Sequence, residues 1–311
     1  MTNVRDHGGG IDAAIAQFGG ARAGWLDLST GINPVPYPMP NLPPDAWTAL
    51  PDKDAFDRLY DLARRFWNVP EGAAIIGATG ASAIIAAMPR VLPKGEVRIP
   101  GPTYNEHGAA FAAAGWALVQ DPSHVTVAVH PNNPDGHMWQ SLALTSPYLI
   151  IDESFCDVTP DASLIHLAER PGTVVLKSFG KFWGMAGLRL GFAIGDPKII
   201  GKLTDLLGPW QVSGPALAIG AEALSDPQWA DESRSRLTSD AAQMDKLMTN
   251  KGATLAGGTS LFRLYDVGDA RALQSHLANR HIWSRCFPYA PQWLRLGLPA
   301  PERWNQLQSA L

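Results

Sequence analysis

The sequence predicts an α/β fold: a mostly parallel, doubly wound sheet flanked by helices, followed by a smaller α+β region. Short apolar runs rich in β-branched residues alternate with helical stretches as far as residue 195, which is typical of β-α-β units. From about residue 199 long helices take over, and short strands and helices follow them. The expected organisation is an N-terminal arm over 1–44, a large domain over 45–210 and a small C-terminal domain over 211–311.

Length and composition favour an ordinary globular protein and exclude several classes. With 311 residues, 46% hydrophobic and 17% charged, the chain is long enough to bury a sizeable core. A net charge of −4 gives no electrostatic reason to expect nucleic acid or a membrane as partner. Cys156 and Cys286 lack disulfide-framework or metal-ligand spacing, so no metal site is expected. The absence of a secretory leader pattern leads us to expect a cytoplasmic protein.

The expected arm is extended and proline-rich. A short helix is expected over 11–18, and five prolines between residues 36 and 44 exclude a helix or central strand there. The segment Trp25-Leu26-Asp27-Leu28 is too apolar to suit a solvated tail. A docked arm is therefore favoured over the alternative, a flexible tail.

The following elements are expected from their periodicity. A helical stripe over 55–66 stops at Asn68-Val69-Pro70. Strands are expected over 74–77, 97–100, 125–129, 148–151 and 173–176, and helices over 83–90, 105–114, 216–224 and 229–250. The small domain is expected from segments 259–264, 272–280 and 293–298.

Two strand ends carry residues suited to a ligand. The small-residue turn Ala78-Thr79-Gly80-Ala81-Ser82 enters a helix, whose free N–H groups suit a phosphate, although many α/β loops look similar. Asp152 follows a buried apolar strand at its carboxyl end, where open α/β sheets bind ligands. An N-cap of a helix explains Asp152 equally well at this point.

The stretch Ser178 to Phe192 is the most informative part of the chain. It follows a buried strand and contains Lys181 among glycines and bulky aromatics, with Arg189 eight residues later. Desolvation disfavours an ammonium group, as a Schiff-base lysine requires. Ser178 and Arg189 could both bind one dianionic phosphate. The alternative is a strand-loop-strand corner with a chance lysine.

Taken together, these motifs resemble the fold-type-I pyridoxal-phosphate (PLP) enzymes, in the aminotransferase superfamily branch that includes histidinol-phosphate aminotransferase. The match consists of Asn133 in an Asn-Pro-x-Gly turn, Asp152 after a strand, Ser178-x-x-Lys181 and Arg189, in this order and spacing. The resemblance covers essentially the whole chain. It implies a large domain with a seven-stranded sheet, a small domain, and PLP as cofactor.

The resemblance also implies a role for each site residue. Lys181 would attach PLP covalently and later move protons at the substrate Cα. Asp152 would pair with the ring nitrogen, Asn133 would bind the ring O3′, and Tyr104 would stack on the ring. The implied catalytic residues are Lys181, Asp152 and Asn133, and the implied cofactor-binding residues are Gly80, Ala81, Tyr104, Asn133, Asp152, Ser178, Lys181 and Arg189.

The beginning of the chain narrows the resemblance. His7-Gly8-Gly9, the segment Trp25 to Pro34 and Tyr37-Pro38 are similar to the decarboxylases that act on threonine phosphate in cobalamin biosynthesis. This implies decarboxylation of L-threonine O-3-phosphate, a small phosphorylated amino acid, by a homodimer. The implied substrate-binding residues are His7, Asn33, Arg285 and Arg295. Arg22 is a further candidate for a second anion site.

Two alternative functions stay open at this point. Histidinol-phosphate aminotransferase, or a related aminotransferase, differs only in which Cα bond lies perpendicular to the cofactor ring, and a sequence does not determine that angle. A non-catalytic PLP-binding regulator would be expected to carry a DNA-binding extension or to lack the lysine. Lys181 is present.

The chain departs from the family pattern at two positions. Many relatives have a tyrosine three residues after the strand-end aspartate, whose hydroxyl also binds O3′, and here the residue is Phe155. Many also have a tyrosine before the Pro-Asp of the first helix, which reaches the phosphate of the neighbouring subunit. Here Leu50 precedes Pro51-Asp52, which weakens the expectation of that intersubunit contact.

Overall fold

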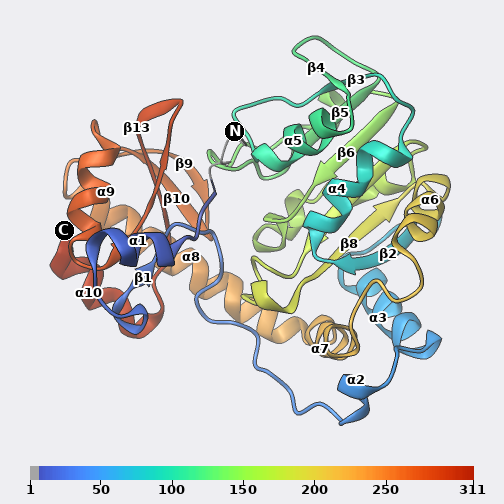
Figure 1. Cartoon of the computed structure of the whole chain (residues 1–311), viewed down its shortest axis with the longest axis horizontal. Coiled ribbons are helices and arrows are strands. Elements are labelled where there is room, and N and C mark those ends of the chain that lie inside the picture. Colours follow the sequence, from blue (N-terminus) through green and yellow to red (C-terminus); the bar gives the residue numbers. More distant parts are fainter. Residues whose placement is uncertain (1–6) are drawn as a thin grey trace. The chain divides into compact units, whose positions relative to one another are not determined.

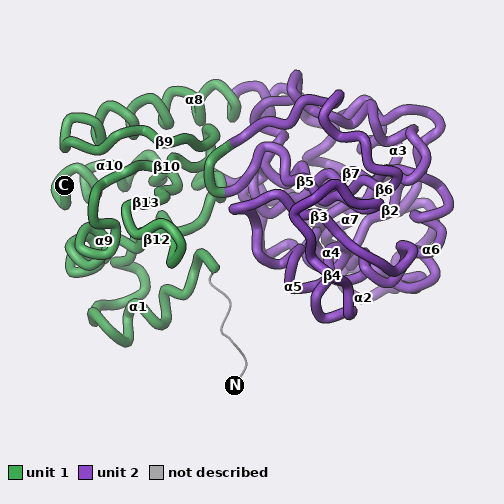
Figure 2. The backbone as a smooth tube through the Cα atoms, turned by 90° about the horizontal axis from the view of Figure 1, so that it is seen from above, with its two compact units in different colours: residues 1–35, 134–136, 233–311 green, residues 36–133, 137–232 purple. Residues whose placement is uncertain are grey.

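The computed structural model describes residues 7–311, and they form two compact units (Figure 2). Unit 1 contains the described residues up to 35 together with 134–136 and 233–311. Unit 2 contains residues 36–133 and 137–232. Among the described residues, no helix combines the length and apolar character needed to cross a bilayer.

Unit 2 is built on a mostly parallel sheet, which has seven strands within the described part of the chain (Figure 1). All neighbouring pairs are parallel except those that involve β8, which runs antiparallel to both its neighbours. In spatial order the strands are β2 (Ala74–Thr79), β8 (Leu190–Gly195), β7 (Thr173–Ser178), β6 (Tyr148–Asp152), β5 (Val125–Val129), β3 (Glu96–Arg98) and β4 (Ala117–Val119).

The core of unit 2 lies between this sheet and three helices, α4 (Ala81–Val91), α5 (Asn105–Ala113) and α6 (Pro197–Leu207). The central strands are buried along nearly their whole length, and only Tyr148 and Ser178 at strand ends are partly exposed, as expected for parallel strands covered on both faces. Apolar side chains of the helices, such as Ile84, Phe111 and Leu203, pack onto the strands in one cluster. The sheet is therefore a rigid platform whose strand ends can position side chains.

Two further helices of unit 2 have a side-chain cap at their start. Asp52 caps α3 (Lys53–Phe66) by accepting a hydrogen bond from the Ala55 N–H, and Ser213 caps α7 (Gly214–Leu224) in the same way through Ala216. The remaining helices that begin in this unit are α2 (Asp45–Thr48) and α8 (Pro227–Thr249).

Unit 1 is an α+β unit around an antiparallel sheet, which has four strands among the described residues. Their order is β12 (Arg285–Phe287), β13 (Ala290–Gly297), β10 (Phe262–Asp266) and β9 (Thr254–Thr259). A separate parallel pair joins β1 (Leu26–Asp27) to β11 (Ile282–Trp283). The helices of this unit are α1 (Ile11–Phe18), α9 (Ala270–Ala278), α10 (Trp304–Ala310) and the C-terminal part of α8.

The first part of the arm is docked, as the sequence suggested. Trp25 and Leu28 are buried, and Leu26 pairs with Ile282 through β1 and β11. The expected α/β class and mostly parallel sheet are confirmed. Apart from residues 134–136, the two compact units divide the chain after residues 35 and 232, and the domain boundaries expected at 44 and 210 stay predictions. Helix α7 packs against α3, and this non-local contact keeps it within unit 2.

Candidate functional site

The residues expected to bind the cofactor gather at one edge of the large sheet. Strands β2, β3, β5, β6 and β7 point the same way, so their carboxyl ends meet at this edge, and the antiparallel strand β8 begins there. The residues that follow or occupy these strand ends are Gly80, Ala81, Tyr104, Asn133, Asp152, Ser178, Lys181 and Arg189. All eight belong to unit 2.

Asp152 ends β6 in a fully buried position and makes specific hydrogen bonds. The His107 Nε2 atom lies 2.8 Å from its Oδ2, and the N–H and hydroxyl of Ser154 donate to its Oδ1 at 2.9 and 2.5 Å. Burial alone would raise the pKa of Asp152, but the hydrogen bond and charge of His107, with the Ser154 donors, outweigh it and lower the pKa. Asp152 is thus held as a carboxylate.

His107 is a site residue that the sequence analysis missed. It lies in α5 and is 1% exposed, and its ring meets that of Tyr104 edge-on with centroids 6.1 Å apart. His107 follows Tyr104 by three residues, about one helical turn, so the spacing alone would place both side chains on the same side of the helix. A single histidine in an alanine-rich helix is nevertheless a weak pattern.

Gly80 and Arg189 form a tight cradle at the start of α4. Gly80 has φ 78°, and a Cβ added there would collide with the Arg189 guanidinium. Gly191 lies opposite both Ala78 and Ser178 in the strand register, and a Cβ on it would collide with the Ala81 backbone nitrogen. Two positions without side chains therefore bring the helix start, Arg189 and Ser178 together.

This cradle fits the phosphate of the cofactor that the sequence resemblance implies. It combines the N–H groups of a helix start, a guanidinium and a hydroxyl, which are the donors that a dianionic phosphate requires. Lys181 and the carboxylate of Asp152 lie at the same sheet edge. The residues present thus fit PLP.

The departure at Phe155 faces Lys181 directly. The Nζ atom of Lys181 lies 5.4 Å from the centroid of the Phe155 ring, and Phe155 is buried.

The loops that carry Tyr104 and Asn133 are joined by Asn132, which donates to the Pro102 carbonyl at 2.9 Å and accepts from the Thr103 hydroxyl at 2.5 Å.

The four expected substrate residues all belong to unit 1. Arg285 and Arg295 are direct cross-strand partners in β12 and β13, so their side chains leave the same face of that sheet. Arg295 is 3% exposed, donates to the Ser29 carbonyl at 2.6 Å and lies 5.1 Å from the Phe262 ring centroid. Asn33 is buried and accepts from Arg236 at 2.5 Å.

A cavity of about 430 Å³ in unit 1 brings His7 and Arg285 together. Arg271 of α9, which the sequence analysis did not single out, lines it as well. Neither Arg295 nor Asn33 contributes to its wall. Arg22 also lies outside this lining, in the short turn before β1.

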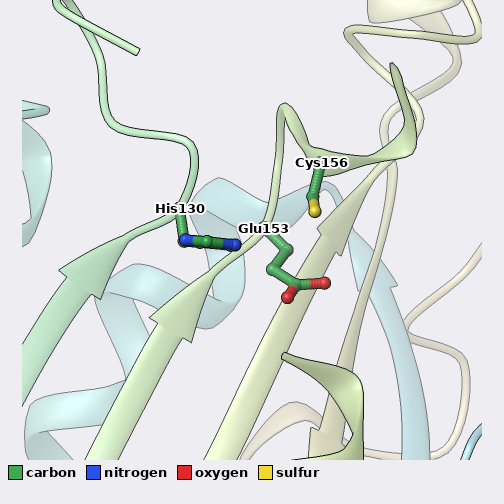
Figure 3. Close-up of side chains that lie close together, drawn as sticks. All are labelled: His130, Glu153 and Cys156. Carbon is green, nitrogen blue, oxygen red and sulfur yellow. The ribbon is translucent and has the colours of Figure 1, made fainter. Parts of the chain in front are cut away.

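One cluster of metal-ligating side chains is found among the described residues (Figure 3), and its members already make contacts within the protein. Its members His130, Glu153 and Cys156 place one ligand atom each within 4.8 Å of one another. The His130 Nδ1 accepts from the Trp139 N–H at 3.0 Å and its Nε2 lies 2.8 Å from the Ala162 carbonyl. Burial raises the pKa of Cys156 well above its usual range. These groups suit a packed core better than a metal.

Comparison with known proteins agrees with this geometry. Residues 120–310 match the family described as aminotransferase class I and II. The chain is 38% identical to the threonine-phosphate decarboxylase of Pseudomonas aeruginosa, over 98% of this chain and 97% of that protein. It is 26% identical to the histidinol-phosphate aminotransferase of Symbiobacterium thermophilum, over 82% and 79%.

A solved structure shares the fold along the chain. The histidinol-phosphate aminotransferase of Sinorhizobium meliloti, determined in complex with pyridoxal-5′-phosphate, superposes with a TM-score of 0.83 at 18% identity. The match covers 99% of this chain and 94% of that one. The fold is therefore that of the fold-type-I PLP enzymes, and the chain belongs to the class I and II aminotransferase family, together with the threonine-phosphate decarboxylases.

Proposed function

We propose that this chain is a PLP-dependent enzyme that decarboxylates L-threonine O-3-phosphate to (R)-1-aminopropan-2-yl phosphate, a step in cobalamin biosynthesis. The observation that carries the proposal is the 38% identity to a threonine-phosphate decarboxylase along 98% of the chain. The histidinol-phosphate aminotransferase is more distant, at 26% over 82%. When bound, PLP withdraws electrons from the Cα bond that breaks.

Residues at the sheet edge would hold and activate the cofactor. Lys181 would attach it and later move a proton at the substrate Cα. Asp152, kept ionised by His107 and Ser154, would accept a hydrogen bond from the ring nitrogen and keep it protonated. Asn133 would donate to the ring oxygen, and Tyr104 would cover the ring face.

The cradle would hold the cofactor phosphate. Gly80 and Ala81 would donate backbone N–H groups, Ser178 its hydroxyl and Arg189 its guanidinium. The cradle is supported on both sides, because Arg189 also donates to the Ala186 carbonyl at 3.0 Å and Ser178 accepts from the Gly180 N–H at 3.3 Å. A phosphate held by such fixed donors needs little rearrangement on binding.

The arginine pair of unit 1 would bind the substrate. Like charges directly across a strand pair repel, and an anion between them reverses that penalty. Arg285 and Arg295 occupy such a pair. Arg295 would take the carboxylate and Arg285 the phosphate. His7, which lines the same cavity as Arg285, and Asn33 in the arm would contribute further contacts.

We also expect a homodimer located in the cytoplasm. Several large apolar side chains of unit 2 are exposed, and Met39, Trp47, Leu50 and Trp210 are among them. Exposed apolar groups of this size are common where a second subunit packs. Leu50, which occupies the position of the missing tyrosine, is among them. The cysteines Cys156 and Cys286 are both free thiols, which suits a reducing compartment.

The reaction is tested by supplying threonine phosphate to the PLP-loaded protein with and without 2-oxoglutarate. We expect carbon dioxide release that does not depend on the oxo-acid. Glutamate formation from histidinol phosphate and 2-oxoglutarate, without carbon dioxide from threonine phosphate, would instead identify an aminotransferase. A protein that stays colourless with added PLP would contradict the cofactor itself.

A further inference from the structure

A second lysine lies four residues before Lys181 and is completely buried. Lys177, 2% exposed, places its Nζ 2.6 Å from Glu153 Oε2 and 3.7 Å from Asp157 Oδ1. Burial alone would lower the pKa of Lys177, but the charges of the two carboxylates raise it above its usual range. Lys177 therefore stays an ammonium ion and is unsuited to the nucleophilic attachment of a carbonyl compound.

Both carboxylates in this cluster are fully engaged. Glu153 accepts from the Leu164 N–H at 2.5 Å and the Ser163 hydroxyl at 2.7 Å, in addition to its contact with Lys177. Asp157 accepts from the indole N–H of Trp67 at 2.9 Å and of Trp183 at 3.1 Å. The Lys177 ammonium also lies 5.6 Å from the centroid of the Trp67 ring.

Stability alone is a weak reason for such a cluster. Removing charges from water costs several kcal/mol per ion, and well-packed apolar residues often replace a buried ion pair without loss of stability. Buried polar networks do, however, specify one arrangement of the groups that they join. The residues next to the network are therefore the ones whose positions it is expected to fix.

The members of the network adjoin the cofactor residues along the chain. Glu153 follows Asp152, Lys177 precedes Ser178, and Trp183 lies two residues after Lys181. Asp152 pairs with Leu176 across β6 and β7. Because successive residues of a strand face opposite sides, Lys177 lies on the opposite face from Ser178.

We propose that Lys177, Glu153 and Asp157 form a positioning network that holds the strand end at Asp152 and the loop carrying Ser178 and Lys181 in the geometry that binds PLP. Glu153 ties the end of β6 to Lys177 of β7, and Asp157 ties both to the loop through Trp183. The inference rests on the proposed cofactor chemistry at Lys181. None of the three charged residues is a catalytic residue.

The first test substitutes Lys177→Met and Glu153→Gln, with Lys177→Arg to restore the charge. Protein freed of PLP is titrated with PLP, and the pH dependence of the visible absorbance is recorded beside the melting temperature. For Lys177→Met and Glu153→Gln we expect the Kd for PLP to rise about tenfold or more, with a displaced pH profile, and Lys177→Arg to recover most of the affinity. A folded Lys177→Met protein with wild-type Kd and pH profile would overturn the proposal.

If Lys177→Met does not fold, two more conservative variants test the positioning role. Trp183→Phe removes the hydrogen bond to Asp157 but keeps an aromatic ring in the stack with Phe179, whose centroid lies 5.0 Å away. Trp116→Phe is the matched control, because it removes a buried indole hydrogen bond to the Pro89 carbonyl outside the network.

Both variants should lose similar stability, and only Trp183→Phe should raise the Kd for PLP, by about threefold or more. Equal Kd values in the two variants would refute the positioning role. The wild-type protein separates this inference from the proposed function. If it binds PLP and releases carbon dioxide while Trp183→Phe matches Trp116→Phe, only the positioning role fails.

Discussion

The expected cofactor residues belong to one compact unit and the expected substrate residues to the other, and the two sets come from different kinds of structure. In unit 2 the expected cofactor residues lie at or beyond the carboxyl ends of strands in one mostly parallel sheet, except Arg189, which directly precedes strand β8 at the same edge. In unit 1 the expected substrate residues come from the arm, at His7 and Asn33, and from an antiparallel sheet, at Arg285 and Arg295. The cofactor half thus follows from a general property of parallel sheets, whereas the substrate half depends on local contacts.

This contrast leads to separable expectations. Substitutions at the sheet edge of unit 2 should change the affinity for PLP or its visible absorbance. Substitutions at the arginine pair of unit 1 should leave the colour of the protein unchanged and change the KM for threonine phosphate. The division of roles would be contradicted by a substitution in the arginine pair that changes PLP absorbance, or by one at the sheet edge that changes only the KM.

The largest effect is expected for Lys181→Ala. Loss of the attachment point should abolish the covalent absorbance band of PLP, and activity should fall by about 10⁴-fold because proton transfer at the substrate Cα is lost too. Absorbance after borohydride reduction and the rate of carbon dioxide release measure the two effects. Lys198→Ala, at an exposed position in the same unit, should match the wild type in both. If the Lys181→Ala protein still held PLP that borohydride can reduce, the covalent attachment would be at another residue.

A smaller effect is expected for Gly80→Ala. The added Cβ meets the Arg189 guanidinium, so the cradle must open and the Kd for PLP should rise by about thirtyfold. Gly208→Ala is a matched control, because Gly208 has φ 79° but no neighbour within 4 Å of an added Cβ.

Both glycine substitutions should cost roughly 1–3 kcal/mol of stability, because both glycines combine a positive φ with an extended ψ that other residues rarely adopt. Only Gly80→Ala should weaken PLP binding, as measured by fluorescence titration. If the two variants bound PLP alike, backbone strain alone would account for the glycine.

His107→Ala tests how the acid at the sheet edge is held ionised. The pKa of Asp152 in the folded protein lies below its ordinary value of 3.8, so its contribution to stability is complete above that pH and is lost as the pH falls through the folded value. Without His107 the burial of Asp152 dominates and raises its pKa. The acid limb of the stability curve should therefore move to higher pH, as measured by denaturation of the PLP-free protein. An unchanged acid limb would show that Ser154 alone suffices.

The sequence predicted the sheet edge better than its surroundings because the edge depends on local patterns. The buried runs ending at Asp152 and before Ser178 are visible as strands, and parallel strands must align their ends. The sequence gives no separate bounds for strand β8, because the glycines around Arg189 leave the start of the strand after the Lys181 loop without a clear signal. Its antiparallel pairing with β2 is a long-range feature that no local pattern encodes.

The parts that escaped prediction depend on tertiary contacts. His107 is important only because α5 brings it within 2.8 Å of Asp152, which lies 45 residues away. In the sequence Lys177 and Glu153 are 24 residues apart and have no common motif. The pairing of β6 with β7 brings them together as an ion pair. Arg271 joins the cavity only through the placement of α9.

The smallest effect is expected for Arg285→Lys, which tests the substrate half. Lysine keeps the charge but loses the two-pronged geometry with a phosphate, so the KM for threonine phosphate should rise about tenfold, while the visible absorbance of PLP stays unchanged. Arg280→Lys is the control, since Arg280 is exposed and its guanidinium makes hydrogen bonds to His276 four residues earlier. Substrates separate the roles further: free threonine should bind Arg285→Lys and the wild type equally, because it lacks the phosphate. A loss of affinity for free threonine as well would place Arg285 at the carboxylate instead.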